Sequence, residues 1–111
     1  MINIERRDKI DIITFTIKSI NALVTEELKE EINGALQNGS TRVVLSLKNV
    51  EYIDSSGFGC LLSIMRTARN NYCLLKLAAP EPAVLKVLNT LNLNTVFEIF
   101  EDVDECVRSM R

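Results

Sequence analysis

The four residues at positions 54–57, Asp-Ser-Ser-Gly, have the side chains with the clearest chemical potential in this chain. They follow an apolar run that predicts a buried strand, 43–47, and precede an apolar stretch that predicts a helix, 58–68. The first turn of a helix has unpaired N–H groups and the positive end of the helix dipole, so it favours negative charge. A serine at this place is therefore either a structural residue of the helix start or a site that can accept a phosphate group.

Each of these residues has its own expected role. Asp54 is predicted to be the N-cap of the helix. Ser55 is predicted to be a capping or turn hydroxyl, whereas Ser56 is the candidate phosphate acceptor. Gly57 is expected to permit a close backbone approach, and Gly59 to allow tight packing of the first turn.

The aromatic residue after this motif leaves two alternatives open. Phe58 is either part of the core or an exposed anchor for a partner, since aromatic side chains dominate interface hot spots. Leu61 and Leu62 are adjacent on the same helix, so both cannot face the core fully. One of the two leucines is therefore expected near the surface.

Other catalytic chemistry has little support in the sequence. The chain has no histidine, which excludes Ser-His-Asp and Cys-His catalysis and histidine metal sites. Cys60, Cys73 and Cys106 do not have the spacing of zinc ligands, and we interpret them as buried apolar residues. Neither a Gly-x-Ser-x-Gly elbow nor a Gly-x-x-x-x-Gly-Lys loop is present. We expect no enzymatic activity, no cofactor and no metal, and keep a hydrolase acting through Ser56 as a minor alternative.

The composition is that of a soluble globular protein. The chain has 111 residues, of which 47% are hydrophobic and 25% charged. Its net charge of −2 gives no reason to expect nucleic acid as a partner. It has no apolar run long enough to span a membrane, and charged residues interrupt its N-terminus before a signal peptide could form. These features predict a cytoplasmic protein without membrane insertion, and we expect a monomer.

Hydrophobic periodicity predicts alternating strands and helices. Asp8 and Lys9 are expected to turn the chain between the first two strands, Thr25 to cap the first helix, and Gly39 to end it. Asp102 and Glu105 can form a capping box. The segment 19–24 is predicted to be irregular. The predicted strands are 2–5, 10–17, 42–47, 73–78 and 96–100, and the predicted helices are 25–39, 57–71, 82–91 and a final one from about residue 102.

This order predicts an α/β fold. Strands that alternate with helices form a mostly parallel sheet, with an antiparallel hairpin at the N-terminal end. We expect one domain over 1–111, with a mixed sheet of about five strands and about four helices. The strand 42–47 is apolar on both faces except at Ser46, so it is predicted to be central and covered on both sides.

The sequence closely resembles the STAS domain of bacterial anti-sigma factor antagonists. The resemblance covers essentially the whole chain, and its most specific part is the run 52–59, from Tyr52 to Gly59. It includes the central strand 43–47 and continues through the apolar patterns at 61–68, 84–93 and 97–99.

The resemblance implies a switch. Proteins of this family bind an anti-sigma factor that is also a serine kinase, and this frees a sigma factor. The kinase phosphorylates the serine directly before the glycine, which corresponds to Ser56 here, and a serine phosphatase resets the cycle. The residues that the resemblance and the motif place at the partner contact are Asp54, Ser55, Ser56, Gly57, Phe58 and Asn21.

The sequence departs from the family pattern in two places. Where many members have Gly-x-Leu-Asp after the second strand, this chain has Lys-Ser-Ile-Asn at 18–21. Where many have Asp or Asn in the central strand, it has Ser46. These changes motivate an alternative function, in which the chain is a STAS module that acts without phosphorylation as a subunit of a transporter or a stress-sensing complex.

Overall fold

A five-stranded mixed sheet forms the centre of the computed structural model, which describes residues 1–111. The strand order is β1-β2-β4-β6-β7; β1 is antiparallel to β2 and the other pairs are parallel. This confirms the predicted α/β class. The strands are β1 (Ile2–Arg7), β2 (Ile10–Phe15), β4 (Arg42–Ser46), β6 (Leu74–Ala78) and β7 (Ile99–Phe100).

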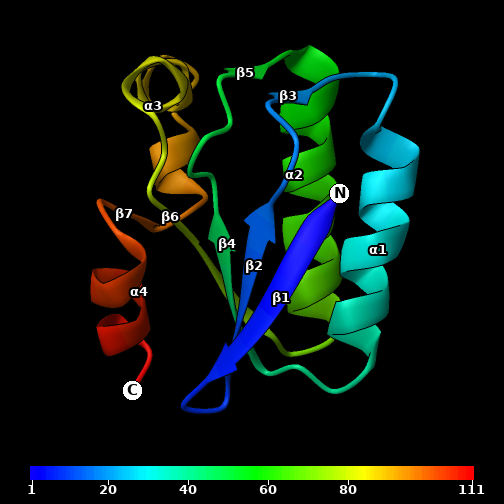
Figure 1. Cartoon of the computed structure of the whole chain (residues 1–111), viewed down its shortest axis with the longest axis vertical. Helices are drawn as coiled ribbons and strands as arrows, with labels where there is room; N and C mark the ends of the chain where they lie inside the picture. Colours follow the sequence, from blue (N-terminus) through cyan, green and yellow to red (C-terminus); the bar gives the residue numbers. More distant parts are fainter.

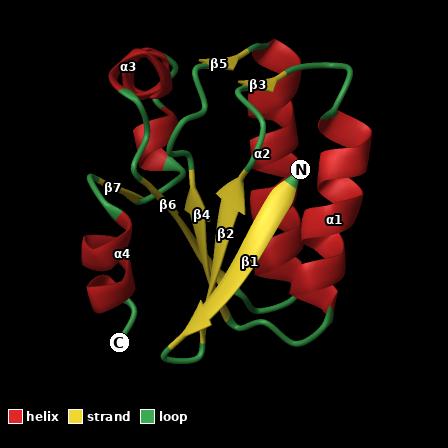
Figure 2. Cartoon of the chain, in the orientation of Figure 1, coloured by secondary structure: helices red, strands yellow, loops and turns green.

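Four α-helices surround this sheet (Figures 1 and 2). They are α1 (Thr25–Gln37), α2 (Ser55–Asn70), α3 (Pro82–Thr90) and α4 (Val103–Ser109), and a short 3₁₀ helix, η1 (Leu93–Thr95), follows α3. Helices α1 and α2 lie side by side on one face of the sheet, and α4 lies on the other (Figure 1). None of the helices is long and apolar enough to cross a bilayer.

The central strand β4 supplies both hydrophobic cores, as its apolar pattern predicts. Successive side chains of a strand point to opposite faces. Val43 and Leu45 therefore lie in a cluster of 24 buried residues with α1, α2 and α3, whereas Val44 lies in a cluster of seven with α4. All three β4 side chains are fully buried, so the sheet is covered on both faces at its centre.

The N-terminal hairpin turns where the sequence predicts. Asp8 and Lys9 have φ values of 53° and 66°, the left-handed conformation at both central positions of a tight hairpin turn. Gly39 also has a positive φ of 91° and directly follows Asn38, the C-cap residue of α1. Both predicted turns are confirmed.

Three predicted details are wrong. Thr25 does not cap α1: Val24 is the N-cap, and the Thr25 hydroxyl donates to the carbonyl of Ala22 at 3.5 Å. The predicted strand 96–100 contains only Ile99 and Phe100, because the N–H groups of Val96 and Phe97 donate back to the Leu93 carbonyl, at 3.0 and 2.9 Å. The segment 19–24 is not wholly irregular, because its first two residues form a short strand.

That short strand, β3 (Ser19–Ile20), pairs in parallel with β5 (Tyr52–Ile53) in a second sheet. The second sheet lies beyond the ends of β2 and β4, next to the start of α2 (Figure 1). It therefore links the end of the hairpin to the segment that leads into the Asp-Ser-Ser-Gly motif.

Candidate functional site

The small sheet fixes the backbone that leads into α2. Ser19 is paired with Tyr52 and Ile20 with Ile53, and the Asp54 N–H then donates to the Ile20 carbonyl at 3.2 Å. The chain is thus hydrogen-bonded up to the residue before the helix. These backbone hydrogen bonds fix the position of the helix start without a contribution from the side chains of the motif.

Asp54 caps α2, as predicted. Its Oδ1 accepts a hydrogen bond from the Gly57 N–H at 2.9 Å, and its backbone is extended, as the N-cap position requires. The first helical bond runs from the Phe58 N–H to the Asp54 carbonyl at 3.0 Å. The N–H groups of Ser55 and Ser56 precede this bond, so they have no acceptor within the helix.

The two serines remain free for other interactions. Both Ser55 and Ser56 are exposed, and neither hydroxyl has a hydrogen-bond partner in the protein. Because Asp54 already fills the capping role, Ser56 is not needed to complete the helix start. The site thus presents an unbonded hydroxyl beside two unpaired N–H groups at the positive end of a 16-residue helix.

Gly57 permits the close backbone approach that the sequence predicts. A Cβ atom at this position would collide with the Ile20 carbonyl oxygen and would lie 2.6 Å from Ile53 Cγ2. Only glycine therefore lets β3 and β5 contact the first turn of α2. The expectation for Gly59 is wrong, because a Cβ there would meet no atom within 4 Å.

The aromatic residue of the motif belongs to the core. Phe58 is 6% exposed and lies in the large cluster, which decides between the two alternatives considered for its side chain. Leu61 is fully buried and Leu62 only partly, so one leucine of the pair lies near the surface as predicted. Phe58 and Gly57 are thus buried beneath the exposed serines and hold the first turn of α2 in place.

Asn21 lies at the same end of the small sheet as Asp54, because each follows the last paired residue of its strand. Its Oδ1 accepts from the Leu23 N–H at 2.9 Å, and its Nδ2 donates to the Ser19 hydroxyl at 3.3 Å. Asn21 therefore stabilises the turn that leads to α1. Ser46, the other position that departs from the family pattern, is 2% exposed and lies below the surface.

Exposed apolar side chains near the motif were not predicted from the sequence. Leu23 is 93% exposed, Tyr52 59% and Val87 40%. Tyr52 and Val87 border a hollow of about 120 Å³ between β5 and α3, and Phe58 forms part of its lining. The alternation of Tyr52 with buried Ile53 was an available signal, but a strand of two residues is too short to show periodicity.

Burial keeps the three thiols in their protonated form near neutral pH. Cys60, Cys73 and Cys106 are buried and unpaired, as predicted. Burial raises the pKa of the Cys60 thiol and raises the pKa values of Cys73 and Cys106 to about 11, which keeps the thiols protonated near neutral pH. No three cysteine or carboxylate side chains are close enough to share a metal ion.

Sequence comparison places the chain among STAS proteins. The model of the STAS domain family matches residues 1–106. A Thermotoga maritima protein, whose name gives anti-sigma factor antagonist as a provisional role, is 28% identical over 76 residues; these cover 68% of this chain and 67% of that protein.

Solved structures share the fold. A T. maritima crystal structure, also of a provisionally assigned anti-sigma factor antagonist, has a TM-score of 0.85 at 21% identity over 97% of this chain and 92% of its own. The anti-sigma factor antagonist SpoIIAA in its unphosphorylated form has 0.81 at 21% identity over 100% and 96%. The phosphorylated form of SpoIIAA from Bacillus has 0.74 at 20% identity over the whole of both chains. Because the family model spans residues 1–106 and the architecture agrees throughout, this chain belongs to the STAS domain family.

Proposed function

We propose that this chain is an anti-sigma factor antagonist that binds a serine-kinase anti-sigma factor and is released when that kinase phosphorylates Ser56. Its STAS membership and its relative in T. maritima support this class of protein. The two solved states of SpoIIAA, with and without phosphate, support phosphorylation as the switch. In this proposal the chain is a regulatory binding protein and not an enzyme, and a serine phosphatase restores its active form.

The observation that carries the proposal is the state of the Ser56 hydroxyl. It is exposed and unbonded at the second position of α2, while the Asp54 carboxylate takes the capping role. A kinase can reach this oxygen without unfolding the helix start. Ser55 has the same exposure but stands one residue earlier, so it serves as the natural control for position.

The fold tolerates the modification in this proposal. A phosphate on Ser56 adds about −1.5 to −2 charges at neutral pH. The dipole of α2 and the unpaired N–H groups of Ser55 and Ser56 attract that charge, and an exposed anion at such a place stabilises a helix by about 0.3–1 kcal/mol. Repulsion from the Asp54 carboxylate offsets part of this gain. The balance leaves the scaffold folded.

A partner interface that covers Ser56 does not tolerate the phosphate. A partner that covers Ser56 excludes water from the site, and an unpaired buried charge is unfavourable by several kcal/mol. Since about 1.4 kcal/mol changes affinity tenfold, a fraction of this penalty is enough to release the partner. The switch therefore needs no large movement of the protein.

The proposed contact surface combines the polar motif with its exposed apolar neighbours. Asp54, Ser55, Ser56 and Asn21 supply polar groups, and Leu23 and Tyr52 supply apolar area at the edge. Gly57 and Phe58, which are buried, take part by holding the backbone of the first turn in place.

The test uses serine-kinase anti-sigma factors encoded in the same genome as this chain. Each is co-expressed with the wild-type protein, and peptide mapping by mass spectrometry locates any phosphate. Affinity is then measured for the wild type and for the variants Ser56→Asp, Ser56→Ala and Ser55→Ala. We expect phosphate on Ser56 only, a loss of affinity of at least about tenfold for Ser56→Asp, and little change for the two alanine variants.

Two results would overturn the proposal. One is a Ser56→Asp variant that binds as tightly as the wild type, with no phosphate found on Ser56. The other is recovery of the chain from cells with transporter subunits and no kinase, which would favour a STAS module that acts without phosphorylation. Thermal melting of Ser56→Asp is the control, and its midpoint should equal or exceed that of the wild type.

A further inference from the structure

A second surface, on the opposite side of α3 from Tyr52, has the features of a peptide-binding edge. We propose that the outer edge of β7, with the hollow beside it, binds an extended segment of a partner protein in which apolar and basic side chains alternate. This surface is formed by β7, the α3 residues that face it and the acidic residues after β7. It does not include the Ser56 motif.

The first element of the surface is an unpaired strand edge. β7 bonds to β6 through the Leu77 N–H to the Glu98 carbonyl at 3.0 Å and the Ala79 N–H to the Phe100 carbonyl at 2.9 Å. Because the backbone groups of successive residues point to alternate sides, the N–H and C=O of Ile99 point away from β6. An open edge of this kind is a template for an added strand.

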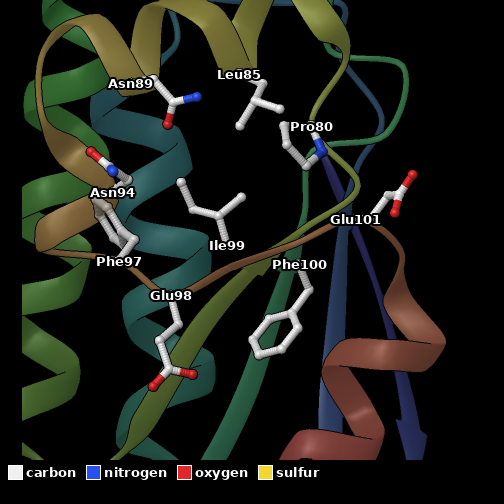
Figure 3. A pocket seen from close by; sticks show the side chains of 9 residues that line it. All are labelled: Pro80, Leu85, Asn89, Asn94, Phe97, Glu98, Ile99, Phe100 and Glu101. Atoms are coloured by element: carbon white, nitrogen blue, oxygen red, sulfur yellow. The ribbon is translucent and has the colours of Figure 1, made fainter.

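The second element is a hollow of about 560 Å³, the largest in the molecule together with one of equal size near Pro82 (Figure 3). Leu85 from α3 and Ile99 from β7 point toward each other across it, and the amides of Asn89 and Asn94 lie together on one side (Figure 3). The hollow has room for apolar side chains of an added strand. The amide groups can bond to the backbone of that strand at its end.

The side chains of β7 alternate in character, which sets the pattern expected of the partner. Ile99 packs against the large cluster on the α3 side, and Phe100 against the small cluster on the α4 side. A strand added beside them presents apolar side chains next to Ile99 and the remaining side chains on the α4 side. There it meets the carboxylate of Glu98, whose side chain is 66% exposed and already forms an ion pair with Lys76 at 2.9 Å.

The negative charge of this surface favours basic residues at the positions of the added strand that lie on the α4 side. A neighbouring hollow of about 410 Å³ shares Pro80 and Glu101 with the first, and its charged lining consists of four carboxylates and a single lysine, Lys48. Three of these carboxylates already have partners: Asp104 pairs with Arg7 at 2.7 Å, Asp102 accepts from the Glu105 N–H at 2.7 Å, and Glu81 accepts from the Asn49 N–H at 3.4 Å. Glu101 is exposed and has neither an ion pair nor a hydrogen bond. The surplus of negative charge attracts lysine and arginine.

The other open edge of the sheet lacks this combination. β1 has six residues, but Glu5, Arg6 and Arg7 on it are charged, and no hollow adjoins it. Charged side chains of this kind discourage strand addition. The β7 edge is short, which limits the added strand to a few residues, but it is flanked by apolar surface that supplies affinity.

The experiment titrates isotope-labelled protein with a synthetic peptide, acetyl-Lys-Val-Lys-Leu-Lys-Val-Lys-amide, and follows backbone amides by NMR. We expect the Ile99 and Glu101 amides to shift, the Ile99 N–H to exchange more slowly with solvent, and the Ser55 and Ser56 amides to stay in place. A peptide methylated on alternate backbone nitrogens keeps its side chains but loses the donors. Its affinity should fall at least about tenfold.

Matched variants on α3 separate this surface from its neighbour. Leu85→Asn alters the β7 hollow and should reduce peptide affinity about tenfold, whereas Val87→Asn alters the hollow near Tyr52 and should leave it within about twofold. Glu101→Gln should weaken binding about threefold at low salt, and less at high salt. Melting curves confirm that each variant is folded.

Several outcomes would overturn the inference. They are an absence of shifts at Ile99 and Glu101, equal binding of the methylated peptide, or equal losses from Leu85→Asn and Val87→Asn. The titration is repeated with Ser56→Asp, for which the same peptide affinity is expected. A loss of peptide binding in that variant would contradict the separation of this surface from the switch, whereas partner release in Ser56→Asp tests the switch alone.

Discussion

The two faces of the central sheet differ in the size of the hydrophobic core that covers them. On one face 24 buried residues join the sheet to α1, α2 and α3; on the other seven buried residues join it to α4. The same strands supply both faces through alternating side chains. The face with the larger cluster, called the deep face, carries the first turn of α2 with Ser56, so this turn rests on the larger of the two cores. The other, called the shallow face, is where the structure can open locally.

Polar contacts supplement the small core of the shallow face. Lys76, which is 8% exposed, pairs with Glu98 at 2.9 Å, donates to the Ser109 hydroxyl at 3.1 Å, and lies 5.3 Å from the centre of the Phe100 ring. These contacts join β6, β7 and α4. Pairs with one exposed partner contribute about 0–1 kcal/mol each, so α4 depends mainly on Cys106, Val107 and Met110.

The largest expected difference between the faces comes from neighbouring isoleucines on β2. Ile13 is fully buried in the large cluster, and Ile12 is 3% exposed in the small one. We expect Ile13→Ala to lower the free energy of unfolding by about 4 kcal/mol and Ile12→Ala by about 2 kcal/mol, because α4 can move to fill part of the space. Urea unfolding measures both. Equal losses would mean that the two faces are equally rigid.

The next difference concerns two glycines of α2. Gly57→Ala forces its Cβ against the Ile20 carbonyl and Ile53, and we expect a loss of about 1–3 kcal/mol. Gly59→Ala meets no atom within 4 Å and should gain about 0.5–1 kcal/mol from helix propensity. Thermal melting of both variants tests this. A stable Gly57→Ala variant would contradict the tight contact between the small sheet and the helix start.

The sequence predicted those parts of the fold that long periodic patterns or single residue types specify. The apolar run 43–47 identified the central strand, and Asp54 identified the start of α2, because a short carboxylate side chain at a strand-to-helix junction has one main structural use. The strands β3 and β5 were missed, since two residues cannot show a period. Thr25 was assigned as a cap by its type alone, and the backbone placed the cap at Val24 instead.

The cap at Asp54 and the close approach at Gly57 were predictable from the sequence, whereas the surroundings of the motif were not. The clash at Gly57 depends on Ile20, which is distant in sequence, and glycine by itself does not distinguish this position from the open one at Gly59. The hollow beside β7 depends on how α3 is placed over the sheet edge. Exposure of Leu23 and Tyr52 likewise follows from tertiary packing, so an apolar residue type gave no sign of it.

Thiol labelling compares local opening of the two faces without changing the sequence. Cys106 is fully buried on the inner face of α4, and Cys60 is 3% exposed between α1 and α2. From static exposure alone, Cys106 should react more slowly. Because α4 has only seven residues and a small core, we expect Cys106 to react about tenfold faster with a neutral thiol reagent, through local detachment of the helix. Peptide mass spectrometry after timed labelling gives both rates; a slower Cys106 would contradict the mobile shallow face.

The smallest expected effect is a loss of stability at alkaline pH, and each face of the sheet has one thiol that reports it. Burial raises the pKa values of the Cys73 and Cys106 thiols from 9.0 to about 11. Between these values the unfolded chain has lost the thiol proton while the folded chain keeps it. The unfolded state then binds fewer protons, so stability falls as pH rises from about 9 to about 11.

Each thiol should account for a loss of about 1 kcal/mol at pH 10 relative to pH 8, since one pKa unit corresponds to about 1.4 kcal/mol. Unfolding free energies of Cys73→Ala and Cys106→Ala at both pH values should therefore decline less than those of the wild type. The difference between the two pH values removes the effect of the substitution itself. If Cys73→Ala reduces the decline and Cys106→Ala does not, α4 detaches at high pH and releases its thiolate before the rest of the protein unfolds.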